Sequence, residues 1–154
     1  MNALRSMLAT AALALVTPAQ AGVNDPELII YRASGVLDNG GAASTGTATA
    51  FSCTNFSGVG ELIRVVVRGA TGALLANVGF SFGHLETINF TTKGTALYAA
   101  QVMNTGVVVR GTAAIATTTV NITCTAMLVD AGASVPQGIA LRMVRFNPIP
   151  GTVE

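Results

Sequence analysis

The stretch "VNITCTAMLVD", Val120 to Asp130, alternates apolar and polar residues around a central cysteine. Alternation with a period of two is typical of a β-strand with one buried face. The predicted buried face carries Val120, Ile122, Cys124, Ala126 and Leu128, and the opposite face carries Thr119, Asn121, Thr123 and Thr125. We therefore expect Cys124 to point into a hydrophobic core.

The amino terminus indicates the cellular compartment to which the protein is sent. Residues 1–21 contain one basic residue, Arg5, then an apolar run, Pro18 and a small-x-small cleavage site, Ala19-Gln20-Ala21. This order is typical of a secretory signal peptide, and the run is too short to span a bilayer. A buried amphipathic helix is the alternative. We expect a bacterial protein exported to the periplasm or the cell exterior, with one domain over residues 22–154.

Export makes a disulfide the simplest interpretation of the two cysteines. Cys53 lies in "TATAFSCTNF", another strand-like stretch, where it shares a face with Phe51. We predict that Cys53 and Cys124 are bonded. Closing a loop of about 70 residues stabilises a fold by about 4 kcal/mol in the chain-entropy model. Two buried free thiols are the alternative, whereas the absence of CxxC spacing argues against a redox or metal role.

Charge excludes several classes of partner. The chain has eight Lys or Arg and seven Asp or Glu, and Arg5 belongs to the predicted signal, so the charges of residues 22–154 balance. Without a basic patch or an acidic run, we do not expect nucleic acid or anionic lipid to be attracted over distance. These residues also lack a second long apolar run, so we predict no transmembrane segment in the mature chain.

The rest of the mature sequence also has the patterns of strands and turns. In "ELIRVVVRG", Ile63, Val65 and Val67 share one face, and Arg64 and Arg68 the other. The turn "GATG" leads into "ALLANVGFSF", which indicates a hairpin. On that second strand the aligned residues are Leu74, Ala76, Val78, Phe80 and Phe82.

Further predicted strands cover 28–37, 106–120 and 137–146, with a glycine-rich loop over 38–46. "ETINFTT" and "GTALYAA" are shorter strand candidates. No mature segment has a helical period. We predict an all-β domain, an immunoglobulin-like β-sandwich of about seven to nine strands, with a jelly roll as the alternative.

The immunoglobulin-like assignment rests on an early and a late cysteine that would bridge the two sheets. The chain has no tryptophan for the core, and Ile122 stands where a tyrosine corner would be. The sequence also resembles a group of small exported bacterial proteins without an assigned activity. The resemblance lies in "ATAFSCTNFSG", "RVVVRG", "MNTGVVVRGTAAIA", "ITCTAMLVDA" and "ALRMVRFNP". It implies export and an immunoglobulin-like sandwich, and it implies no function.

Few residues suggest catalysis. His84 is the only histidine, and Glu86 would share its face in a strand, as an acid–base pair or part of a metal site. A histidine at the end of a loop is the other interpretation. Asp130 and a serine could complete a triad, but no GxSxG context supports it. "DNGG", from Asp38, lacks calcium-loop spacing. We predict no catalytic, cofactor or metal residues.

The methionines and the sequons are interpreted as parts of strands. Met103, Met127 and Met143 are spaced irregularly and fit strand faces as core fillers, not copper ligands. The Asn-x-Ser/Thr sequons begin at Asn55, Asn89 and Asn121, and in a bacterial protein they reflect strand composition.

The remaining clues favour binding or assembly over enzyme activity. Threonines at 117–119 and beside Cys124 predict a flat uncharged face that suits sheet contact, glycan contact or solvation. We expect a non-enzymatic binding or envelope-associated module with a protein or glycan partner. The alternative is a self-assembling subunit that pairs edge strands, with the arm Gly22–Glu27 either free to join a neighbour or part of the domain's first strand. A hydrolase or metal carrier centred on His84 is less favoured.

Overall fold

The structure is a computed structural model, and it describes residues 27–98 and 100–146. The predicted signal peptide and most of the Gly22–Glu27 arm lie outside the described residues. The described residues form ten β-strands and no helix. The strands are β1 (Leu28–Asp38), β2 (Thr47–Asn55), β3 (Glu61–Arg68), β4 (Leu74–Phe82), β5 (Thr87–Thr91), β6 (Gln101–Val102), β7 (Val108–Thr117), β8 (Ile122–Asp130), β9 (Gly138–Leu141) and β10 (Met143–Arg145).

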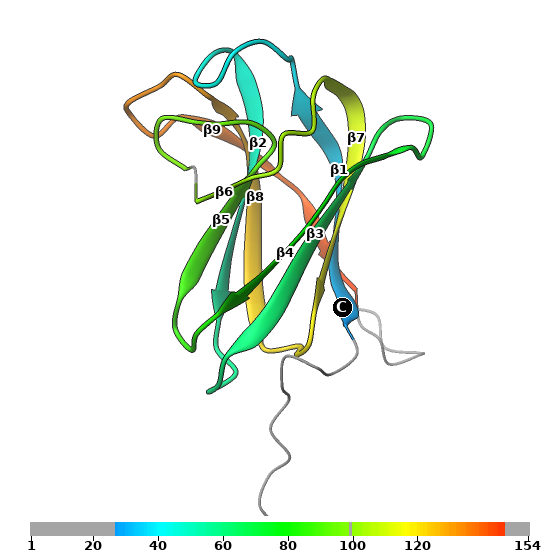
Figure 1. Cartoon of the computed structure of the whole chain (residues 1–154), viewed down its shortest axis with the longest axis vertical. Coiled ribbons are helices and arrows are strands. Elements are labelled where there is room, and N and C mark those ends of the chain that lie inside the picture. Colours follow the sequence, from blue (N-terminus) through cyan, green and yellow to red (C-terminus); the bar gives the residue numbers. More distant parts are fainter. Residues whose placement is uncertain (1–26, 99, 147–154) are drawn as a thin grey trace, which may run out of the picture.

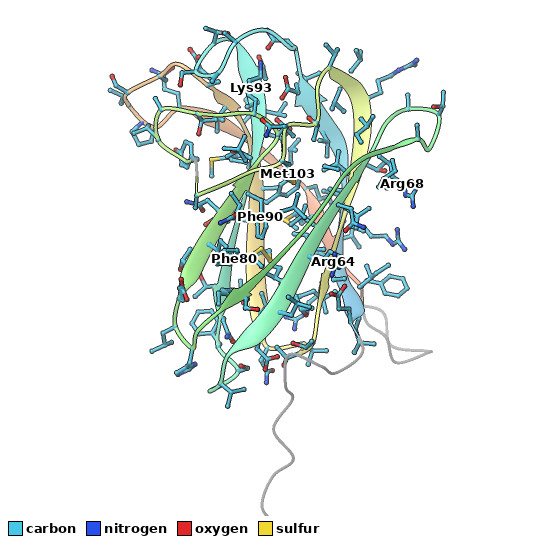
Figure 2. All side chains as sticks on the ribbon, viewed as in Figure 1. Arg64, Arg68, Phe80, Phe90, Lys93 and Met103 are labelled. Atoms are coloured by element: carbon cyan, nitrogen blue, oxygen red, sulfur yellow. A yellow bond between two sulfur atoms is a disulfide. The ribbon has the colours of Figure 1, made fainter. Side chains whose placement is uncertain are left out.

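The strands form two five-stranded sheets, which lie side by side in Figure 1. Sheet A has the order β10-β1-β7-β3-β4, and sheet B has the order β6-β5-β2-β8-β9. Neighbours are antiparallel except for β5 and β6. Inward-facing residues of both sheets meet in one hydrophobic core, which includes Phe90 and Met103 (Figure 2). The prediction of an all-β, sandwich-like domain is confirmed, and the immunoglobulin-like topology stays a prediction.

The segment 137–146, predicted as a single strand, forms two strands, β9 and β10. The prediction is wrong in this respect. The first half of the segment, β9, pairs with β8 in sheet B. Its second half, β10, pairs with β1 in sheet A. The chain thus passes from one sheet to the other at Arg142, as strands do at the corners of sandwiches.

The predicted strand "GTALYAA" is also wrong. Its described residues form turns and irregular backbone. Ala96 N donates a hydrogen bond to Ala131 O at 2.9 Å, which holds the segment near the end of β8. There Tyr98 packs against Ala48, Ala50 and Val129 on the outer side of sheet B. The segment covers the sheet and does not extend it.

The β3–β4 hairpin confirms most of its predicted pattern. Val65 lies opposite Val78, and Val67 lies opposite Ala76. The turn closes where Gly72 N donates to Gly69 O at 2.9 Å. A register shift lies between Val67 and Arg68, and Leu74, which pairs with Arg68, is 54% exposed. The predicted alignment of Leu74 with Ala76 and Val78 is therefore wrong.

The predicted disulfide is present, and it joins two neighbouring strands of one sheet. Cys53 and Cys124 lie directly opposite each other on β2 and β8, with their Cα atoms 4.1 Å apart. Both side chains point into the core, as predicted. The expectation that the bond bridges the two sheets is wrong, because β2 and β8 pair along their whole length. The main sequence argument for immunoglobulin topology is therefore lost.

The end of the Gly22–Glu27 arm is docked. Glu27 forms an ion pair with Arg64, with Glu27 Oε2 2.7 Å from Arg64 Nε. The hydrogen bond to Glu27 and its negative charge raise the pKa of Arg64 above its usual value. Residues 22–26 lie outside the described part of the chain, so the role of the rest of the arm stays a prediction.

Candidate functional site

The histidine and glutamate considered for catalysis lie in a turn. Glu86 N donates to Gly83 O at 3.2 Å, which closes the turn between β4 and β5. His84 and Glu86 therefore do not share a strand face, and His84 lies at the end of a loop, as the other interpretation of the sequence predicts. His84 Nδ1 accepts a hydrogen bond from Gly58 N at 3.0 Å, and Glu86 Oε2 accepts one from Gly83 N at 2.7 Å. Both side chains hold loops together at this end of the sandwich.

Metal-ligating side chains are also dispersed. Within residues 27–98 and 100–146, no group of three or more His, Cys, Asp or Glu side chains is placed to hold a metal ion. Met103 lies in the main core, and Met127 and Met143 pack against core clusters. The methionines thus occupy the filler positions that the sequence predicts.

The "DNGG" loop does surround a cation, which is the ammonium group of Lys93 at one end of the sandwich (Figure 2). Lys93 Nζ lies 3.0 Å from Asp38 Oδ1, 2.9 Å from Asn39 Oδ1 and 3.1 Å from Thr45 O, and it also donates to Gly40 O. Lys93 is 7% exposed. The loop oxygens are therefore occupied by the chain's own lysine, a partner that linear spacing does not reveal.

The outward side of sheet B carries a regular array of small polar side chains. Across β5, β2 and β8, one row is Asn89, Ser52 and Thr125, and the next row is Thr87, Thr54 and Thr123. We call these six residues the hydroxyl face. The hydroxyls of Thr54 and Thr87 are hydrogen-bonded at 2.8 Å. Neighbouring strands are about 4.8 Å apart, so the polar groups are closely and evenly spaced.

An exposed aromatic ring lies at the end of this array. Phe56 follows β2 directly and is 52% exposed. Its N–H donates to Asn121 O at 2.9 Å, while Leu85 N donates to Asn55 O at 2.7 Å. Backbone pairing thus continues past the strand ends and holds Phe56 between two neighbouring segments.

A cavity of about 220 Å³ opens beside Phe56. It is lined by Phe56, Val120, Asn121, Ile122, Thr123 and Arg145. β9 pairs only with Ala126–Val129 of β8. Residues 122–125 of β8, which lie beside the cavity, therefore have no partner on that side within the described strands. Arg145 Nη2 donates to Val120 O at 2.7 Å, which fixes the guanidinium at the cavity wall. Among the described residues, the lining includes no carboxylate, histidine or cysteine.

The sequence predicted the threonines beside Cys124 as part of a polar face but missed Phe56. The prediction was wrong for Thr117 and Thr118, which are buried. Thr123 and Thr125 are exposed, as the alternation around Cys124 predicts. Ser52, Thr54 and Phe56 follow the same period of two, so an aromatic residue ends an otherwise polar face. That mismatch was the available signal.

Of the sequon residues, Asn55 is buried, and its Nδ2 donates to Val59 O and Phe82 O.

Comparisons with protein-family models, curated proteins and solved structures found no match to the chain. The resemblance to small exported bacterial proteins therefore stays a prediction. The described residues contain no helix with the length and apolar character needed to cross a membrane.

Proposed function

We propose that the protein is an exported, non-enzymatic glycan-binding module that binds a neutral polysaccharide at Phe56 and the hydroxyl face. The observation that carries this proposal is an exposed aromatic ring beside an ordered array of hydroxyl and amide groups. A pyranose ring has an apolar C–H face that packs on an aromatic ring, and its hydroxyl rim exchanges hydrogen bonds with nearby polar groups. Asn121 and Thr123 supply such groups in the cavity beside Phe56.

The chemistry of this surface favours a glycan over a protein partner. Stable protein interfaces bury about 800 Å² on each partner around an apolar, well-packed core. The hydroxyl face is instead uncharged and made of short side chains, and Phe56 is the aromatic residue beside it. Short side chains on a sheet also lose little rotamer freedom when a ligand binds.

Affinity electrophoresis and pull-down with cellulose, chitin, xylan and mannan test the proposal. We expect at least one of these polysaccharides to bind the mature wild-type protein. Phe56→Ala should weaken that binding about thirtyfold, because truncating a central aromatic anchor costs about 2 kcal/mol. Phe56→Trp should retain it. Val109→Ala is the matched control, since Val109 is an exposed apolar residue on β7 of the other sheet.

Two results would overturn the proposal. One is a wild-type protein that binds none of the four polysaccharides. The other is a Phe56→Ala protein that binds as tightly as the Val109→Ala control while keeping the wild-type melting temperature.

A second candidate function, self-assembly, is favoured by the edge of sheet A. β4 is a nine-residue edge strand, "LLANVGFSF", without a charged residue or proline to block pairing with another chain. Val78 on β4 packs partly buried against the core. Light scattering of the mature protein tests this candidate. Assembly should be lost in Val78→Lys, which places a charge at the inward side of the edge, and retained in Val109→Lys.

A further inference from the structure

The two sheets differ sharply in charge. All six arginines of residues 22–154 lie on strands of sheet A or on the link into it, at Arg32, Arg64, Arg68, Arg110, Arg142 and Arg145. The strands of sheet B contain no arginine or lysine, and Asp130 is their one charged residue. The expectation that the mature chain has no basic patch is therefore wrong in three dimensions, because strands distant in sequence become neighbours.

Two of these arginines share a groove on sheet A. The groove has a volume of about 590 Å³ and is lined by Arg32, Ser34, Thr112 and Arg142, together with Ala33, Ala113 and Val144. Ser34 and Thr112 lie opposite each other on β1 and β7, and Thr112 lies opposite Arg68 on β3. Two guanidinium groups and two hydroxyls thus line one concave surface, with a third arginine in the next strand position.

These charges lack compensation among the described residues. The described part of the chain has two ion pairs, Arg64 with Glu27 and Lys93 with Asp38, and neither involves Arg32 or Arg142. The Arg32 guanidinium lies 5.7 Å from the centre of the Phe146 ring. A cation–π contact of this kind orients a guanidinium and leaves its charge and its donors available.

We infer that this groove binds the oxyanion groups of an acidic polysaccharide, which are carboxylates or sulfates. A guanidinium presents paired N–H donors that match a carboxylate or sulfate, and the hydroxyls of Ser34 and Thr112 add further donors. Arg68 lies two strands from Ser34, which is about 10 Å at the usual strand spacing. A polymer with repeated acidic groups therefore reaches a second cationic position and gains avidity.

The shape of the site favours a polysaccharide over a membrane. The groove is concave, and its lining includes two small residues, Ala33 and Ala113. A bilayer surface cannot enter such a recess, whereas a single sugar-borne group can. This groove shares no lining residue with the cavity beside Phe56, although Arg145 of β10 lines that cavity and its neighbour Val144 lines the groove.

Binding measurements with polygalacturonate, dextran sulfate and neutral dextran of matched length test the inference. We expect binding to at least one acidic polymer, with an affinity that falls as salt rises, and no binding to neutral dextran. Arg32→Gln and Arg142→Gln should each weaken acidic-polymer binding about tenfold, the effect of losing one charge-assisted contact. Arg110→Gln is the matched control, because it removes the same charge from an exposed position of sheet A outside the groove lining.

Four results would overturn the inference. They are no binding to either acidic polymer, an equal loss in Arg110→Gln, equal binding to neutral dextran, and binding to phosphatidylglycerol vesicles in place of the polymers. Phe56→Ala should leave acidic-polymer binding unchanged. Failure of this site and failure of the proposed glycan function are therefore distinguishable.

Discussion

Replacing Lys93 with methionine should destabilise the domain strongly. The Lys93 ammonium lies 3.0 Å from the Asp38 carboxylate, and the side chains are only 9% and 2% exposed. Methionine has a similar length but no charge, so the variant leaves Asp38 buried without its counter-ion. Asp38 Oδ2 already has no hydrogen-bond partner among the described residues.

The magnitude follows from the geometry. At 3.0 Å and an effective dielectric constant of 20, two unit charges attract by about 5.5 kcal/mol. Desolvation of the two groups offsets much of that attraction in the wild type, but the variant still buries the carboxylate. Breaking a buried ion pair from one side costs about 3–5 kcal/mol. We expect Lys93→Met to lower the free energy of unfolding by that amount.

Urea unfolding followed by circular dichroism measures the change, with free energies from linear extrapolation. The double variant Asp38→Asn, Lys93→Met should recover part of the loss, because it removes the buried charge. Arg110→Met is the control and should change stability by less than about 0.5 kcal/mol, since Arg110 is exposed. A loss below about 1 kcal/mol in Lys93→Met, or no recovery in the double variant, would refute the reasoning.

Three further changes test other parts of the fold. Cys53→Ala with Cys124→Ala should lower the midpoint of urea unfolding by the equivalent of about 4 kcal/mol, and unchanged stability would contradict the cross-link's role. Gly72→Ala should lower the free energy of unfolding by about 1 kcal/mol in the same assay, because Gly72 has a φ of 84°. An added Cβ would meet no described atom within 4 Å, so the cost comes from the backbone conformation alone. Glu61→Gln should raise the melting temperature by a few degrees, because it removes a carboxylate from a buried position. Glu61 is 1% exposed, and its Oε1 has no hydrogen-bond partner among the described residues. Its Oε2 accepts a hydrogen bond from Thr118 Oγ1. A lower melting temperature would show that the buried charge stabilises the fold.

The two-layer β architecture and the disulfide could be predicted from the sequence. Both depend on the alternation of apolar and polar residues along each strand, which shows the side chains that face the core. A period of two assigns Ile63, Val65 and Val67 to the core without any knowledge of the neighbouring strands, and the structure places all three there. The same rule directs Cys53 and Cys124 inward. Strand order does not follow from alternation, so the expectation that their bond crosses between the sheets was wrong.

The candidate sites were harder to predict because they depend on which strands become neighbours. Phe56 is separated by dozens of residues from Asn121, and Arg32 from Arg142, yet each pair lines one surface. A balanced total charge likewise conceals that the arginines gather on one sheet. Lys93 shows the same limit, since its loop partners lie about 50 residues earlier in the chain and their spacing suggests no cation.

The two proposed sites together predict that one domain bridges two polysaccharides. The cavity beside Phe56 and the groove at Arg32 share no lining residue, so we expect that a ligand at Phe56 does not block the groove. Beads coated with the neutral polysaccharide that binds should therefore capture a labelled acidic polymer only when the protein is present. Phe56→Ala should abolish capture while acidic binding in solution persists, and Arg32→Gln should weaken capture while the protein still binds the beads. Competition between the two polymers for the wild-type protein would show that they share one surface, and the separation of the sites would then be wrong.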